Sequence, residues 1–224
     1  MIRSDYFHIP NFCPPEVCDF LISEYDRDSD MLNQTDVFSN ADFSYFDKTN
    51  LHKQGLRDKR AKVFVEQLAY NTRQKHIDFF QPEQIWSDTQ VLVKWFPGRD
   101  LGVHADNAYW PSGKPNYVYY RQFSSIVYLS DSSKYEGGEF FFIDPYLEIK
   151  PEKGDLIGFK SGLEHAHGVK MITSGERYTL SLWYTDNIEH AIWDNDSYRQ
   201  DEIDNKNESL QIGPLDRNNI IKLW

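Results

Sequence analysis

Cysteine is nearly absent from this sequence: Cys13 and Cys18 are the only two among 224 residues. Two cysteines cannot form the disulfide framework of a small secreted domain. They lie five residues apart in one N-terminal segment, where a disulfide between them would be awkward, so we expect reduced, half-buried thiols. Stability must then come from a hydrophobic core, for which 40% hydrophobic and 16% aromatic residues suffice.

Long apolar runs are also missing. No segment approaches the roughly 18 apolar residues of a membrane helix. The N-terminal sequence MIRSDYFHIPNF lacks the apolar stretch of a secretory signal. We therefore expect a soluble, cytoplasmic protein with no membrane partner, and the sequence leaves its oligomeric state open.

Positive charge is scarce as well, since the formal net charge is −11. A protein that binds a nucleic-acid backbone needs a basic stripe, and none extends beyond the local cluster at 53–62. We therefore expect no nucleic-acid partner. The acidity places no restriction on a small substrate that fits into a pocket.

The first part of the chain predicts mainly helices. Residues 5–10 indicate a short strand, and residues 14–28 and 57–80 carry apolar residues at helical spacing. The stretch 30–55 has no clear period and is expected to be loop. The long helix at 57–80 is amphipathic, so it should pack on the outside of a sheet.

After Pro82 the sequence predicts strands. Short β-branched and aromatic segments are separated by turns rich in Gly, Pro and Asp; these segments are 90–96, 122–130, 138–143, 155–160 and 177–184. Such spacing is typical of a β-sandwich or barrel. The sequence thus predicts an α+β, mainly β fold in one domain, 1–224, with helical support at 1–85, a β core at 86–185 and an acidic tail at 186–224.

The β half contains a pattern of metal-binding residue types. His104 and Asp106 are two residues apart, so on an extended segment they point to one side, and the same holds for His165 and His167. Arg177 follows His167 by ten residues. Two imidazoles and one carboxylate bind one face of a non-haem Fe(II) and leave positions open for a co-substrate and dioxygen. Arginine suits the far carboxylate of such a co-substrate because it stays charged when buried.

Four stretches carry a family resemblance, in this order: VLVKWFPGRDLGVHADN, SSIVYLSD, YEGGEFFF and KGDLIGFKSGLEHAHGVKMITSGERYTLSLWYT. They resemble the motifs of the prolyl 4-hydroxylase-like branch of the Fe(II)/2-oxoglutarate-dependent dioxygenases. The resemblance covers roughly residues 86–185. It implies a double-stranded β-helix core, of the jelly-roll or cupin-like kind, with the N-terminal helices packed outside.

The resemblance also implies roles for single residues. His104, Asp106 and His167 correspond to the iron ligands, while Arg177 and Tyr128 correspond to the residues that hold the C5 carboxylate of 2-oxoglutarate. His167 is preferred to His165 because it keeps the family's spacing of ten to the arginine, where His165 would make it twelve. His165 is then a residue that supports a metal ligand or faces the substrate.

Other positions are open or depart from the family. Thr179 should share the inward face of Arg177, where its hydroxyl either contacts the same carboxylate or belongs to a plain β-branched strand residue. Ser130 replaces the usual Asn, and Trp95 stands where the family often has Tyr, so a hydroxyl near the co-substrate is expected to be missing.

The loop that follows Asp106 is the leading candidate for a substrate wall. Residues 107–122 mix aromatic residues with glycine and proline, which fits either a plain hairpin or a lid beside the site. Candidate wall residues are Trp110, Tyr119, Arg121 and His165. Arg121 either reaches a substrate carboxylate or forms a salt bridge elsewhere. The loop at 30–55 is the other candidate wall.

The implied function is hydroxylation of a C–H bond with Fe(II), 2-oxoglutarate and dioxygen, and ascorbate is left open as a further cofactor. The resemblance favours a prolyl residue in a peptide or protein as the substrate, with a free amino acid or small metabolite as the alternative. Nucleic-acid demethylation is disfavoured, because Trp183 stands where the dioxygenases that demethylate nucleic acids place a second arginine. A non-catalytic cupin-like metal- or ligand-binding protein is the alternative from a different class.

Overall fold

The computed structural model describes residues 5–29 and 49–191. The helices are α1 (Pro15–Asp28) and α2 (Lys59–Phe80), with short 3₁₀ turns η2 (Lys53–Gly55), η3 (Ser132–Lys134), η4 (Leu163–His165) and η5 (Ile188–His190). The strands are β1 (Tyr6–Ile9), β2 (Asn50–His52), β3 (Trp86–Trp95), β4 (Leu101–His104), β5 (Arg121–Tyr128), β6 (Tyr135–Gly137), β7 (Phe140–Ile143), β8 (Tyr146–Ile149), β9 (Leu156–Lys160), β10 (His167–Val169), β11 (Ile172–Gly175) and β12 (Arg177–Thr185).

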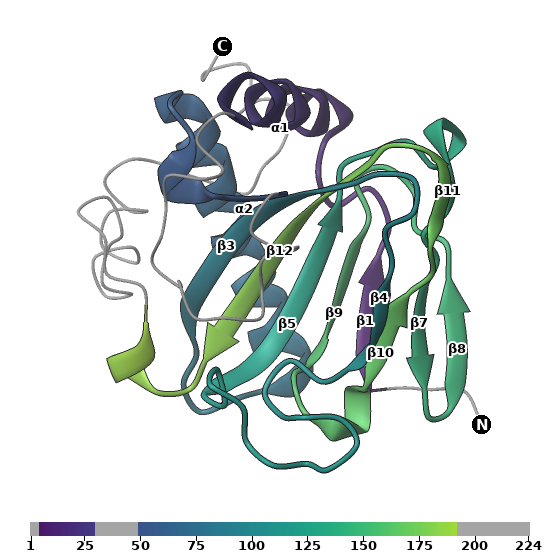
Figure 1. Ribbon diagram of the computed structural model, residues 1–224. Coiled ribbons are helices and arrows are strands. Elements are labelled where there is room, and N and C mark those ends of the chain that lie inside the picture. The colour runs from purple at the N-terminus through teal and green to yellow at the C-terminus, as the bar shows by residue number, and fades with distance from the viewer. Residues whose placement is uncertain (1–4, 30–48, 192–224) are drawn as a thin grey trace.

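The strands form two main antiparallel sheets. The larger sheet has the order β1-β9-β5-β12-β3-β2, and the smaller has the order β4-β10-β7-β8. Strands β11 and β6 form a separate pair. Figure 1 shows the long strands β3, β12 and β5 side by side, with β10, β7 and β8 on the other side of the molecule.

The long strands are apolar on both faces, because each face contacts a different core. On β12, Tyr178, Leu180 and Leu182 belong to the core beneath the helices. The neighbouring position Trp183 packs against the second core, which is made of residues from both sheets. The side-chain period of two therefore gives β12 one face toward the helices and one face toward the interior between the sheets.

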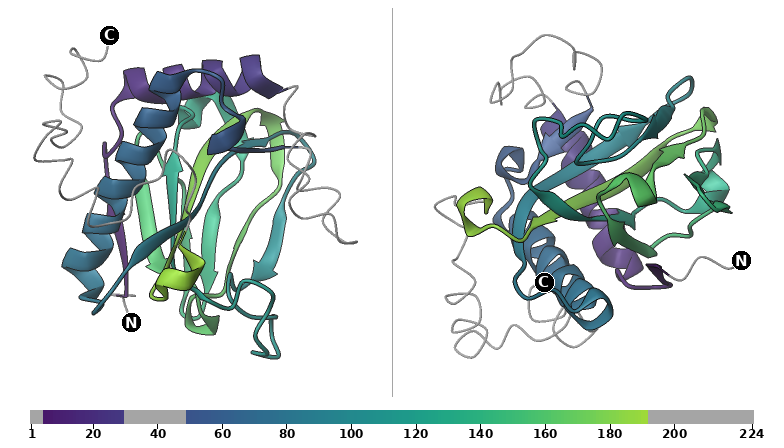
Figure 2. Two further views of the ribbon diagram at one scale, coloured as in Figure 1. Left: turned by 90° about the vertical axis from the view of Figure 1, so that its left-hand side faces the viewer. Right: turned by 90° about the horizontal axis from the view of Figure 1, so that it is seen from below.

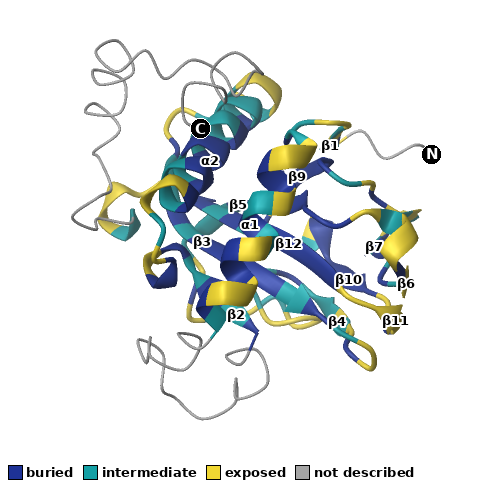
Figure 3. Ribbon diagram, turned by 90° about the horizontal axis from the view of Figure 1, so that it is seen from above, coloured by how far each residue is buried: buried dark blue, intermediate teal, exposed yellow. Residues whose placement is uncertain are grey.

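Helix α2 covers the outer face of the larger sheet. The side chain of Asp58 caps its first turn by accepting from the Arg60 N–H, and Gln81 ends it in the left-handed conformation directly before Pro82. Figure 2 shows α2 running alongside the sheet while α1 lies across one end of it. In Figure 3 the central strands are mostly buried, whereas α1 alternates between buried and exposed positions, as an amphipathic surface helix should.

Most of the expected elements are present. Strand β1 and both helices confirm the predictions, and so do the five strands expected after Pro82, which are β3, β5, β7, β9 and β12. The prediction of loop throughout 30–55 is wrong at β2, which pairs with β3. Residues 30–48 of that candidate wall, and residues 192–224 of the predicted tail, lie outside the described residues. No helix among the described residues is long and apolar enough to span a membrane.

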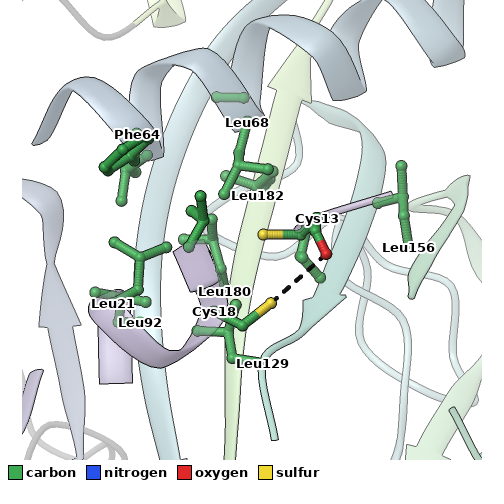
Figure 4. Close-up of a cluster of buried hydrophobic side chains, with 14 of the residues drawn as sticks. Cys13, Cys18, Leu21, Phe64, Leu68, Leu92, Leu129, Leu156, Leu180 and Leu182 are labelled. Atoms are coloured by element: carbon green, nitrogen blue, oxygen red, sulfur yellow. Dashed lines mark hydrogen bonds between the residues drawn. The ribbon is translucent and has the colours of Figure 1, made fainter. Parts of the chain in front are cut away.

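The two cysteines are more deeply buried than expected. Both are free thiols with no exposed surface, so the prediction of half-buried side chains is wrong. They lie where α1 meets the larger sheet, and the Cys18 thiol points to the backbone oxygen of Cys13 at 3.8 Å (Figure 4). Burial and the neighbouring Cys18 raise the pKa of the Cys13 thiol well above its ordinary value. Both cysteines therefore act as small core residues.

His76 predicts how the fold responds to acid. It is fully buried on α2, its Nε2 lies 2.5 Å from the Ser125 hydroxyl oxygen, and burial lowers its pKa to about 3 from 6.5. The imidazole of His76 therefore binds a proton more readily in the unfolded chain than in the folded one, so stability is lost as the pH falls below 6.5. When the pH is lowered from 7 to 5, the unfolding free energy of the wild type should fall by about 2 kcal/mol more than that of His76→Gln. Urea unfolding at both pH values measures the difference. An equal loss in both proteins would contradict this assignment.

Candidate metal centre

The sheet register brings two of the predicted ligands opposite one another. Strand β4 ends at His104, β10 begins at His167, and the two residues are cross-strand partners. Their ring centroids are 4.3 Å apart. Asp106 follows β4 by two residues, and the nitrogen and oxygen donors of all three side chains lie within 4.8 Å of one another. The fold thus gathers His104, Asp106 and His167 into one cluster.

Backbone carbonyls orient both imidazoles. The Nδ1 of His104 lies 2.9 Å from the Gly102 oxygen, and the Nδ1 of His167 lies 2.8 Å from the His165 oxygen. A carbonyl only accepts, so Nδ1 carries a proton in each ring and Nε2 is the nitrogen available to a metal. This is the usual way in which a protein fixes a metal-binding histidine.

The carboxylate of Asp106 is held from a neighbouring strand. Ser124 on β5 donates to its Oδ2 at 2.5 Å, and the Ser124 and Ser161 hydroxyl oxygens lie 2.7 Å apart. The backbone oxygen of Asp106 accepts from the Asn116 side-chain amide at 2.9 Å. These contacts leave Oδ1, which faces His104 Nε2 at 3.5 Å, as the oxygen on the side of the cluster.

The charges of the cluster are those of a metal-binding set. Burial alone would raise the pKa of Asp106, but the hydrogen bond with His104, the neighbouring His167 and the Ser124 hydroxyl hold it well below its ordinary range. Burial lowers the pKa of His167 to about 3, and the charge of His104 adds to this effect. Burial acts against His104, yet its contacts with Asp106 raise its pKa. At neutral pH the carboxylate is ionised and His167 is neutral, which are the forms that bind a metal.

Arg177, at the start of β12, lies buried on the inner face of the larger sheet, which is the face turned away from the helices. The residue is only 1% exposed, and its guanidinium carbon lies 4.4 Å from the Trp95 ring centroid and 5.6 Å from that of Tyr128. Nη1 donates to the Gly138 backbone oxygen at 2.5 Å. Among the described residues, its guanidinium donates to that carbonyl and to no carboxylate, and its Nε has no partner. A buried cation without an anion is costly, so the surroundings of Arg177 suit the carboxylate of a ligand.

Tyr128 and Thr179 lie beside that arginine. The Tyr128 hydroxyl is buried without a hydrogen-bond partner in the part of the chain that the structure describes. Burial raises its pKa, so it is a neutral donor. Thr179 accepts a hydrogen bond from the Trp95 indole N–H at 3.1 Å. The indole nitrogen at the position of the expected tyrosine is thus already used by Thr179, and the co-substrate role of Thr179 stays a prediction.

His165 is not among the three clustered donors. Its Nε2 donates to the Asp5 backbone oxygen at 2.9 Å, and the residue is only 2% exposed. Leu163–His165 forms a 3₁₀ turn rather than the extended segment from which a face shared with His167 was expected. Both rings nevertheless lie near that of Phe159, with centroid distances of 6.3 and 4.7 Å. The place of His165 in the substrate wall stays a prediction. Its contact with the cluster is the backbone oxygen that orients His167.

Two variants distinguish the two histidines. His167→Ala should lose the metal, because it removes a donor atom of the cluster. His165→Ala should retain it, since the carbonyl that holds His167 belongs to the backbone. Iron content after anaerobic reconstitution and gel filtration measures both. Retention in His167→Ala together with loss in His165→Ala would reverse the assignment.

The remaining candidates for the substrate wall differ in exposure. Trp110 and Tyr119 are exposed on the loop after Asp106. Arg121, in contrast, forms an ion pair with Asp88 at 2.7 Å, and its guanidinium carbon lies 4.3 Å from the ring centroid of Trp183. Of the two alternatives for Arg121, the structure shows the salt bridge.

Sequence reasoning missed two polar residues near these sites. Ser124 lies four residues before Tyr128 on β5, so strand alternation could have placed both on the inner face. Tyr135 is the first residue of β6, and its hydroxyl is also buried without a partner among the described residues. It lies at the start of the stretch YEGGEFFF, from which the resemblance implied no residue role.

Comparisons with known proteins agree with this geometry. Residues 66–185 match the family model described as the 2OG-Fe(II) oxygenase superfamily. Human prolyl 3-hydroxylase 3 is 36% identical over 99 residues, which are 39% of this chain and 13% of that protein. Rat prolyl 3-hydroxylase 2 is 38% identical over 96 residues, which are 37% of this chain and 13% of that protein. The match therefore spans only a small part of these relatives.

Solved structures show the same fold at low sequence identity. The viral collagen prolyl hydroxylase of Paramecium Bursaria Chlorella virus-1, in a 2OG complex, has a TM-score of 0.59 at 17% identity, over 85% of this chain and 97% of that chain. A prolyl-4-hydroxylase from Pseudomonas putida has a TM-score of 0.57 at 16% identity, over 82% of this chain and 94% of that chain. These likenesses confirm the mainly β, double-stranded β-helix fold with helices outside.

Proposed function

Because the chain belongs to the 2OG-Fe(II) oxygenase superfamily, we propose that it is an Fe(II)- and 2-oxoglutarate-dependent dioxygenase that hydroxylates a prolyl residue in a peptide or protein. One observation carries the oxygenase part. The larger sheet presents, on β12, a buried arginine without an ion-pair partner, while β4 and β10 of the smaller sheet gather two histidines and an aspartate, all within the described residues. A bound metal would satisfy the donors of the cluster, and one carboxylate of a dicarboxylic acid would pair with the arginine.

The described residues fit the cofactors of this superfamily, which are Fe(II), 2-oxoglutarate and dioxygen. The donors of His104, Asp106 and His167 would hold the metal, and Arg177 with Tyr128 would hold the far carboxylate of the co-substrate. When bound, the metal and co-substrate supply the oxidative decarboxylation that activates dioxygen for hydroxylation of a C–H bond. The chain contributes orientation: two carbonyls fix the imidazoles, Ser124 fixes the carboxylate, and burial keeps water away from Arg177.

The prolyl substrate rests on the relatives and on the surface beside the cluster. The matched relatives are named as prolyl hydroxylases. The loop that follows Asp106 exposes Trp110 and Tyr119, and aromatic surfaces of this kind suit extended, proline-rich segments. The net charge of −11 supports a partner other than nucleic acid. Use of ascorbate, a cytoplasmic location and the single-domain division stay predictions from the sequence.

A turnover screen tests this function. The reconstituted protein is given Fe(II), 2-oxoglutarate and dioxygen with either proline-containing peptides or free amino acids, and succinate is measured together with the mass of each substrate. We expect succinate in step with the gain of one oxygen atom on a peptide proline. Succinate in step with a hydroxylated free amino acid would move the substrate to the small-molecule alternative. No succinate with any substrate, from correctly folded and iron-loaded protein, would refute the oxygenase.

A further inference from the structure

Tyr135 is a buried tyrosine whose hydroxyl has nothing to bond in the described part of the chain. The residue is 3% exposed, and its hydroxyl has no hydrogen-bond partner among the residues that the structure describes. Buried tyrosine hydroxyls usually have one, because an unsatisfied polar group in the interior is costly. The position of this residue therefore needs an explanation beyond packing.

The ring of Tyr135 lies next to Arg177, with Gly138 between them. A Cβ atom added to Gly138 would lie 3.4 Å from Nη1 of Arg177 and 3.5 Å from Cε2 of Tyr135. Gly138 has a φ of +71°, and its backbone oxygen accepts from Arg177. The glycine turn thus lets the guanidinium and the tyrosine ring pack against the same residue.

Tyr135 supplies one of three buried polar groups around the Arg177 guanidinium that have no partner in the described structure. The others are the hydroxyl of Tyr128 and the Nε of Arg177. Burial raises the pKa of both tyrosines, although the charge of Arg177 acts in the opposite direction, so both hydroxyls are neutral donors at physiological pH. This cluster therefore holds two hydroxyl donors and one guanidinium N–H without an acceptor. A carboxylate, with one negative charge and about four lone-pair sites, matches that set.

We propose that Tyr135 is a binding residue for 2-oxoglutarate, donating its hydroxyl to the far carboxylate together with Tyr128 and Arg177. The proposal rests on the proposed function, since it assigns a further residue to the same co-substrate. Two tyrosine hydroxyls would then bind this carboxylate, that of Tyr128 from β5 and that of Tyr135 from β6.

The test compares two keto acids in the wild type and in Tyr135→Phe. Each is titrated into the anaerobic Fe(II)-loaded protein, and binding is followed by the visible absorbance of the chelate. 2-Oxopentanoate has the same chain length as 2-oxoglutarate but ends in a methyl group, so it cannot use the donors around Arg177. Tyr135→Phe should weaken 2-oxoglutarate binding by about 10-fold or more, which is the range for a lost hydrogen bond to a charged group. The binding of 2-oxopentanoate should stay unchanged.

Tyr184→Phe is the matched control. Tyr184 is also buried in the larger sheet, but it faces α2 and its hydroxyl donates to the Ala69 backbone oxygen at 2.8 Å. Tyr184→Phe should lower the Tm of the metal-free protein and leave the affinity for 2-oxoglutarate unchanged. Tyr135→Phe removes no hydrogen bond within the described protein, so its metal-free Tm should match the wild type.

The outcomes separate the proposal from the proposed function. If Tyr135→Phe weakens both keto acids equally, or binds 2-oxoglutarate as well as the wild type does, Tyr135 is a packing residue and the proposal fails. A lowered Tm in Tyr135→Phe with unchanged affinity also means that Tyr135 is a packing residue. If the wild type itself binds no 2-oxoglutarate, the proposed function fails instead.

Discussion

Replacing Arg177 with alanine should raise the 2-oxoglutarate concentration needed for half-maximal turnover by at least about 100-fold. The guanidinium is buried with no carboxylate partner among the described residues, so a ligand carboxylate would form its ion pair. Losing one member of a buried pair costs several kcal/mol because the other charge is left unpaired. The measurement is the initial rate of succinate formation against 2-oxoglutarate concentration.

Iron binding should survive that substitution, because Arg177 is not among the three clustered donors. Arg177→Lys should lie between the wild type and Arg177→Ala, since lysine keeps the charge and loses the planar fork. Arg73→Ala is a suitable control: it removes an arginine that donates to the Ile85 backbone oxygen on the helix side of the protein. An unchanged 2-oxoglutarate requirement in Arg177→Ala would refute the assignment of Arg177.

Replacing Asp106 with alanine should lower iron affinity and turnover by more than about 100-fold. Residues that merely orient metal ligands already contribute about 10- to 100-fold, so the loss of a direct ligand should exceed that range. Asp106 is also the only carboxylate in the cluster that the described residues form, and its pKa is held so low that it is ionised throughout the working pH range. Iron per protein after dialysis, and succinate formation, measure the two effects.

Asp155→Asn is the matched control for Asp106→Ala. Asp155 is likewise a buried aspartate beside a histidine, with its Oδ2 2.7 Å from the Nε2 of His8. It ties β1 to the turn before β9, so its loss should lower stability while the iron content of the folded protein is retained. Equal iron loss in both variants would mean that the effect of Asp106→Ala is a general effect of losing a buried carboxylate.

The sequence predicted the long elements and missed the short ones that carry the cluster. Helix α2 and strand β12 are long enough for their apolar periods to be recognised. Strands β4 and β10 have four and three residues and contain Gly102 and Gly168, so no period can be read from them. Their pairing nevertheless sets His104 opposite His167, which is a property of sheet register rather than of local sequence.

Contacts between distant segments decided the remaining site residues. Spacing suggested an extended segment through His165 and His167, but residues Leu163–His165 form a 3₁₀ turn. The His165 ring bonds to the backbone oxygen of Asp5, which lies 160 residues earlier. Arg121 was expected either to reach a substrate carboxylate or to form a salt bridge, and it forms a salt bridge with Asp88 on β3. The unsatisfied hydroxyl of Tyr135 becomes visible only when β6 packs beside the arginine at the start of β12. None of these three outcomes follows from local spacing.

The most direct test of the central claim is anaerobic addition of Fe(II) and then 2-oxoglutarate to the purified protein. The arrangement of His104, Asp106, His167 and Arg177 predicts a weak visible charge-transfer band in the wild type and none in Asp106→Ala. Absence of that band in wild-type protein that is folded would contradict the assignment of these residues to an Fe(II) and 2-oxoglutarate site.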